Sequence, residues 1–195
     1  FRFYGRIAKA PNLHETATLE AIKNNVDGLE RISGERIWVE LKQILEGNFA
    51  GELATTIVDL GIGPYIGLPA NPNVEELSIV WKRSGSNKLH AITLLSALLR
   101  NQDDVIKLHS RLKLSAYERD LAMFVVEHRP PKIHSKPLLP YQQLLVKSKS
   151  KASDVTNWVI EVLKYNNSPH LEEFQNWELP KFPVSGNMLK ETGVE

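Results

Sequence analysis

The stretch ISGERIWVELKQILEGN, residues 32–48, contains the start, the apolar face and the end of one helix. Ser33 is suited to the N-cap, because its hydroxyl can accept hydrogen bonds from the free amides of the first turn. An apolar stripe with helical spacing follows, formed by Ile37, Leu41, Ile44 and Leu45 and widened by Trp38. Gly47-Asn48 is expected to take the left-handed conformation that ends many helices. Packing then leaves three charged residues unexplained: Glu35, Arg36 and Glu40.

The rest of the chain continues in the same way, with helical periodicity and no convincing pair of strands. Further helices are expected over residues 1–10, 19–29, 51–60, 74–83, 88–100, 103–112, 115–125, 154–165 and 171–177. The segment 88–100 is apolar nearly all round, which indicates the buried helix of the central part. The Gly- and Pro-rich segment 61–73 is typical of a structured connection. The fold class predicted from the sequence is therefore all-α.

Composition limits the kinds of protein that this chain can be. It has 195 residues, of which 42% are apolar and 24% charged, and a net charge of +1. The absence of cysteine excludes a disulfide scaffold, a thiolate metal site and a cysteine nucleophile. No apolar run approaches the roughly 18 residues of a membrane span. Because Phe1 already lies in a helical pattern with no cap before it, the chain is expected to be a piece of a longer protein.

The motifs of catalysis and metal binding are missing. The six histidines lack ligand spacing, and there is no phosphate-binding loop, His-Glu-x-x-His or Gly-x-Ser-x-Gly motif. Gly61, Gly63 and Gly67 have the wrong spacing for a dinucleotide loop and are better explained by a helix end and a turn. Asp103 and Asp104 are better explained as the acidic first turn of a helix than as magnesium ligands. We therefore expect no catalytic residue and no metal ligand in the chain.

Two groups of basic residues remain as candidates for binding. Arg2, Arg6 and Lys9 lie at helical spacing on one face, and arginine is suited to phosphate because its planar fork forms bidentate hydrogen bonds. Residues 129–151 contain no acidic side chain but several basic ones: Arg129, Lys132, Lys136, Lys147, Lys149 and Lys151. Either group can instead be an ordinary solvated surface, and spacing alone leaves both interpretations open.

A resemblance to a known family changes this balance. Residues 1–7 (FRFYGRI), followed by 19–22 (LEAI) and 33–41 (SGERIWVEL), resemble the RNA-binding neck of class II tRNA nucleotidyltransferases, the CCA-adding enzymes. Residues 64–71 (PYIGLPAN) and 182–186 (FPVSG) resemble the eukaryotic, mitochondrial branch of that family. The order and spacing of these motifs make a chance similarity implausible.

The resemblance implies an all-α neck over residues 1–61, a body over 62–135 and a partial tail over 136–195. These parts would hold the acceptor region of tRNA, while a head domain adds C, C and A from CTP and ATP. It assigns Arg2 to the nucleotide pocket, and Glu35, Arg36 and Arg6 to bracing that pocket. RNA contacts are expected from Lys9, Arg129, Lys132, Lys147, Lys149 and Lys151, which would grip phosphates and shape.

The family's Mg²⁺ ligands would lie in the head, so this chain by itself is expected to bind no metal and to incorporate no nucleotide. The resemblance also implies a mitochondrial location, with a cytoplasmic or nuclear pool as a further expectation. Two alternatives stay open. One is a bacterial-type poly(A) polymerase, which shares the neck, although residues 64–71 favour CCA addition. The other is a non-catalytic helical RNA-binding module.

Overall fold

Helices account for all the regular secondary structure of the described residues. The computed structural model describes residues 1–7, 10–11, 13–85 and 87–180, and no strand occurs within these ranges. The all-α prediction is therefore confirmed. In chain order the elements are α1 (Arg2–Arg6), α2 (Thr16–Lys23), η1 (Val26–Arg31), α3 (Gly34–Leu45), α4 (Ala50–Asp59), η2 (Gly63–Ile66), α5 (Val74–Ser84), α6 (Ala91–Leu95), η3 (Ser96–Leu98), α7 (Gln102–Leu112), α8 (Ala116–His128), α9 (Leu139–Lys147), α10 (Ala152–Tyr165) and α11 (Leu171–Gln175).

Helix α3 buries the stripe that its sequence predicts, and Trp38 is only 6% exposed. Two details of the prediction are wrong. Ser33 occupies the N-cap position, but its side chain makes no capping hydrogen bond. Gly47 does not take a left-handed conformation. It is small for another reason: a Cβ atom there would lie 2.9 Å from the carbonyl oxygen of Gly5. This close approach lets the Asn48 amide donate to the same oxygen at 2.9 Å.

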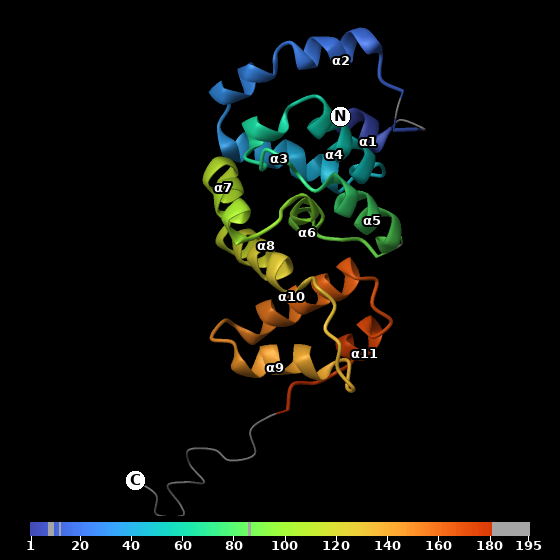
Figure 1. Cartoon of the computed structure of the whole chain (residues 1–195), viewed down its shortest axis with the longest axis vertical. Coiled ribbons are helices and arrows are strands. Elements are labelled where there is room, and N and C mark those ends of the chain that lie inside the picture. The colour runs from blue at the N-terminus through green and yellow to red at the C-terminus, as the bar shows by residue number, and fades with distance from the viewer. Residues whose placement is uncertain (8–9, 12, 86, 181–195) are drawn as a thin grey trace, which may run out of the picture.

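The elements are stacked along the long axis of the molecule (Figure 1). Helices α1–α4 gather at one end and α9–α11 at the other, with α5–α8 between them. The central part is built around α6 and η3, where residues 91–99 are all buried, as the apolar segment 88–100 predicts. Helix α10 joins its own end of the molecule to the central part, because it packs on α9 and α11 and also on α8, α5 and α6. The predicted division at residues 61 and 135 stays a prediction.

Two central helices begin with side-chain caps. Ser115 and Glu118 form a capping box at the start of α8, in which the Ser115 hydroxyl accepts from the Glu118 amide. At α7, Asp103 and Asp104 lie in the first turn, as predicted, but the cap is Asn101, which accepts from the Asp104 amide. The Asp104 carboxylate accepts from the Arg100 amide at 2.9 Å, just before the cap. Ser115 and Asn101 therefore each satisfy a free amide of a first turn.

Several helix boundaries differ from the prediction; the segment 88–100, for example, forms α6 and η3 over residues 91–98 only. Residues 19–29 do not form one helix, because α2 ends at Lys23 and Asn25 turns its side chain back to the Ala21 carbonyl at 2.8 Å. Helix α1 ends at Arg6, since the Gly5 carbonyl bonds to Asn48; residues 8 and 9 lie outside the described part. Helix α9 was not predicted at all. Its buried residues are Tyr141 and Leu145, and Pro140 is tolerated in its first turn.

Candidate nucleotide and RNA-binding surface

Helix α1 lies across α3, and both of its arginines bond to side chains of α3 (Figure 1). Arg2 Nη1 donates to the two carboxylate oxygens of Glu40, at 3.1 and 3.2 Å. One turn further on, Arg6 donates to the side-chain oxygen of Gln43. The Arg2 and Glu40 side chains stay about half exposed, at 49% and 56%. The ion pair therefore orients Arg2 while leaving part of its guanidinium open to a ligand.

Beside this pair lies a hollow of about 540 Å³ with mainly apolar walls. Glu35 and Arg36 lie at its edge, both exposed, and neither forms an ion pair with any other residue in the described part of the chain. The other lining residues are Phe1, Leu29, Ile32, Ile37, Val39, Glu40, Leu41, Ile44, Ile57, Ile62 and Ile66. Apolar walls with two carboxylates, Glu35 and Glu40, and the guanidinium of Arg36 can accept a flat, polar-edged group or another protein surface.

A polar cluster connects α3 to the start of α8. The Trp38 indole donates to Glu118 Oε1 at 3.1 Å, and Lys42 Nζ lies 2.6 Å from the same oxygen. Ser115 donates to the other oxygen from its amide at 3.0 Å and its hydroxyl at 2.8 Å. Burial by itself would raise the pKa of the Glu118 carboxyl, but the hydrogen bonds from Lys42, Ser115 and Trp38 outweigh it and lower the pKa from 4.5 to about 2. Glu118 is therefore ionised at neutral pH and ties α8 to α3.

Arg111, which the sequence did not single out, ties α7 to the same end of the molecule. Its Nε donates to the Tyr65 carbonyl at 2.8 Å, and Nη2 donates to the carbonyls of Leu29 and Ile32 at 2.8 and 3.2 Å. Gly67 lies against it in a left-handed conformation, with φ of 85°. This explains Gly67 as a turn, as predicted, and gives residues 64–69 a structural role. No acidic or basic run in the sequence could have indicated Arg111.

The predicted RNA-binding residues fall into different environments. Lys147, Lys149 and Lys151 are exposed, at the end of α9 and before α10. Lys132 is partly buried, with Nζ 5.6 Å from the Tyr141 ring centre, and burial lowers its pKa. Arg129 is partly buried and donates to the carbonyls of Ser96 and Leu99, so both terminal nitrogens of its guanidinium have partners within the protein.

Arg2, Arg6, Glu35 and Arg36 thus share one end of the molecule, whereas the three exposed lysines near α9 lie toward the other (Figure 1). Lys9 falls outside the described residues. The structure also supplies two partners that the sequence did not assign, Glu40 and Gln43. Their spacing puts each pair on one face of its own helix, but nothing in the sequence indicates that the two faces meet. Among the described residues, no three His, Asp or Glu side chains come together as a metal site.

Comparisons with known proteins identify the class of this surface. A family model described as the probable RNA and SrmB-binding site of polymerase A matches residues 15–69, which include α2, η1, α3, α4 and η2. By this match and by its all-α fold, the chain is similar to the helical region of polymerase A that the family model describes. The chain is more specifically similar to three proteins named CCA tRNA nucleotidyltransferase 1, mitochondrial.

The similarity extends along the whole chain. Identity is 47% to the Mus musculus protein and 46% to the Homo sapiens protein, in each case over 100% of this chain and 45% of the relative. The Danio rerio protein is 43% identical over 99% of this chain and 46% of its own length. The chain therefore spans just under half the length of these relatives. The predicted resemblance to the CCA-adding tRNA nucleotidyltransferases is confirmed. None of the helices in the described part is both long and apolar enough to cross a membrane.

Proposed function

We propose that this chain is the tRNA-binding part of a CCA-adding tRNA nucleotidyltransferase, whose head domain adds C, C and A to the 3′ end of tRNA from CTP and ATP. The observation that carries the proposal is the 43–47% identity, over essentially the whole chain, to proteins named for that activity. A poly(A) polymerase is the weaker alternative. The matched RNA-binding family is described for polymerase A, but it covers only residues 15–69.

In this proposal the end formed by α1 and α3 faces the nucleotide. Arg2 contacts the phosphate or a neighbouring group of the incoming nucleotide, and its ion pair with Glu40 fixes the direction of the guanidinium. Arg6 braces α1 through Gln43. Glu35 and Arg36, at the edge of the apolar hollow, brace the elements that complete the pocket. None of these groups is a catalytic residue.

The metal chemistry is assigned to the head domain of the parent protein. Among the described residues, no three His, Asp or Glu side chains gather to provide oxygen ligands for Mg²⁺. The relatives are named mitochondrial, and we propose the same location for the parent protein.

RNA binding is assigned to the exposed lysines Lys147, Lys149 and Lys151, supported by their exposure and by the lack of any acidic residue between 129 and 151. Lysine is a point charge on a flexible stem, which suits contact with phosphates irrespective of sequence. Lys132 is proposed for a minor share, because it is partly buried, and Lys9 keeps its predicted role. Arg129 is withdrawn from the set.

Gel-shift titration of the chain with tRNA lacking its terminal CCA, over a series of salt concentrations, tests the proposal. Affinity should fall steeply with salt, and a Gln variant of the three lysines should reduce the slope of log K against log salt by about 2 to 3. The matched control replaces three exposed lysines outside residues 15–69, Lys82, Lys88 and Lys107, with the same change in charge. Salt-independent binding, or equal effects of both triple variants, would contradict the assignment.

The parent protein decides between the two polymerase activities. With CTP and ATP, a CCA-adding enzyme extends the trimmed tRNA by three nucleotides and then stops. A poly(A) polymerase needs ATP alone and continues. An RNA-binding module without catalytic function adds no nucleotide to the trimmed tRNA.

A further inference from the structure

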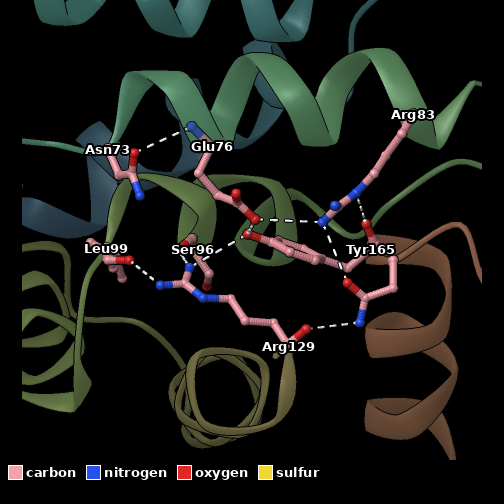
Figure 2. A network of polar contacts seen from close by, with 8 residues as sticks. Asn73, Glu76, Arg83, Ser96, Leu99, Arg129 and Tyr165 are labelled. Carbon is pink, nitrogen blue, oxygen red and sulfur yellow. Dashed lines mark hydrogen bonds and ion pairs between the residues drawn. The ribbon is translucent and has the colours of Figure 1, made fainter. Parts of the chain in front are cut away.

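The two ends of the molecule are connected by polar contacts between the central helices and α10, and the larger group of these gathers around Tyr165 and Arg129 (Figure 2). A smaller group lies on α10 as well, where Glu161 accepts from the His90 amide at 2.8 Å and Lys164 donates to the Lys88 carbonyl at 3.2 Å. The apolar part of the contact includes rings such as Trp158, which lies 6.2 Å from the Tyr117 ring and 5.6 Å from the Phe124 ring. The hydrophobic effect is not itself directional, whereas hydrogen bonds depend on angle, so the polar contacts add a constraint on the angle of α10.

Arg129, the residue after α8, is the first half of the network. Its Nη1 donates to the Ser96 carbonyl at 2.8 Å and its Nη2 to the Leu99 carbonyl at 2.6 Å, so the guanidinium is locked to the end of η3 (Figure 2). Its own carbonyl accepts from the Asn166 side chain at 2.9 Å, just after α10. Arg129 therefore connects three elements that are distant in sequence.

Tyr165, the last residue of α10, is the second half. It is fully buried, and its hydroxyl donates to Glu76 Oε1 of α5 at 2.8 Å. Arg83 of the same helix donates from Nε to the Tyr165 carbonyl at 2.6 Å and lies 5.0 Å from the centre of the tyrosine ring. The Tyr165 hydroxyl also lies 3.4 Å from Arg129 Nη1, which joins the two halves. Burial raises the pKa of Tyr165, so the hydroxyl keeps its proton and remains a donor.

We propose that this network, defined as the joint and formed by Glu76, Arg83, Arg129, Tyr165 and Asn166, is a positioning device for RNA. It fixes α9–α11 at one angle to the rest of the molecule, so that Lys147, Lys149 and Lys151 are held at a set distance from the end formed by α1 and α3. One RNA molecule can then contact both ends without a cost in ordering the protein. The RNA part of this inference rests on the proposed function, whereas the rigidity of the joint does not.

The rigidity is tested by a distance measurement between spin labels. The full chain has no cysteine, so Ile106→Cys on α7 and Val146→Cys on α9, both at exposed positions, take the only two labels. The unaltered joint should give one narrow distance distribution. Tyr165→Phe, which removes one hydroxyl, and Arg129→Gln, which removes three donor contacts, should broaden it. Tyr141→Phe is the matched control, because it removes a tyrosine hydroxyl from α9 that has no hydrogen bond to the described residues.

The link to RNA is tested by combining the joint and lysine variants. Arg129→Gln should weaken tRNA binding about tenfold, because a loose connection lowers the effective concentration of the second contact. In a chain whose three lysines are already Gln, the same substitution should have little further effect. A merely structural role would reduce binding equally in both backgrounds.

The spin-label distances test whether the joint is rigid, and the tRNA titrations test whether it positions RNA. A distribution that stays narrow in Tyr165→Phe and Arg129→Gln, with the circular-dichroism spectrum unchanged, overturns the rigid joint. Broadening with unaltered tRNA affinity, or with equal losses in both lysine backgrounds, overturns the positioning role. If the unaltered chain does not bind tRNA, the proposed function fails and takes the positioning role with it, whereas the spin-label distances still decide whether the joint is rigid. The inference is supported if the distance distribution broadens and the loss of tRNA affinity disappears in the variant whose three lysines are replaced by Gln.

Discussion

Glu118 makes the stability of the chain depend on pH in a predictable way. Its carboxylate is 6% exposed and accepts hydrogen bonds from Trp38, Lys42 and Ser115. The folded pKa is about 2, compared with 4.5 for the group without these interactions. A group with a lowered folded pKa stabilises the fold above its unfolded pKa, and this stabilisation is lost as the pH falls toward the folded pKa.

The size of the effect follows from the two pKa values. The charged form contributes about 3 kcal/mol at neutral pH, of which roughly 2 kcal/mol should be lost by pH 3. Glu118→Gln keeps the size of the side chain and removes its titration. The variant should therefore be less stable than the wild type at pH 7, and the difference should shrink steadily between pH 5 and pH 2.

Urea unfolding of both proteins at several pH values measures this difference. Other carboxylates titrate in both proteins, so their contributions cancel in the comparison. A difference in unfolding free energy that stays constant from pH 6 to pH 2.5 would refute the reasoning, because it would mean that Glu118 has an ordinary pKa in the folded state.

Three further predictions concern the end formed by α1–α4 and the chain as a whole. Trp38→Ala should lower the free energy of unfolding by about 3 kcal/mol, whereas Val39→Ala, at a position 57% exposed, should change it by less than about 0.5 kcal/mol; a urea melt of each variant decides. Gly34→Ala should also destabilise the chain, because a Cβ there would lie 1.9 Å from the Arg111 carbonyl oxygen, whereas Gly28→Ala has open space and should not destabilise it. The purified chain should incorporate no CTP into tRNA, and incorporation by a preparation free of full-length enzyme would contradict this.

The sequence predicted those features that depend on neighbours in the chain. The apolar stripe of α3 and the buried segment at α6 both follow from the spacing of a few residues. The interruption between α2 and η1 was missed because Asn25 competes with the helix through its side chain. Helix α9 was missed because Pro140 and the surrounding lysines hid a short apolar pattern.

Long-range contacts could not be predicted in the same way. Gly34 was expected to lie at a helix start, but no local pattern shows that the backbone of Arg111 passes within contact of it. Likewise, the spacing of Arg2 and Arg6 indicated one basic face, but not that Glu40 and Gln43 bond to it. Such pairs are set by packing between elements, which periodicity does not record.

The inward direction of Arg129 bears on how basic residues are interpreted in an RNA-binding helical protein. Arg83, Arg111 and Arg129 each donate to backbone carbonyls at or near the ends of helices, where such oxygens lack partners within the helix. The fork of donors that suits arginine to phosphate suits it equally to two carbonyls at once. An arginine in the sequence is therefore not by itself a sign of an RNA contact, because the ends of neighbouring helices can bind its donors. In the proposed function, the exposed lysines, which lack that geometry, are the residues assigned to RNA.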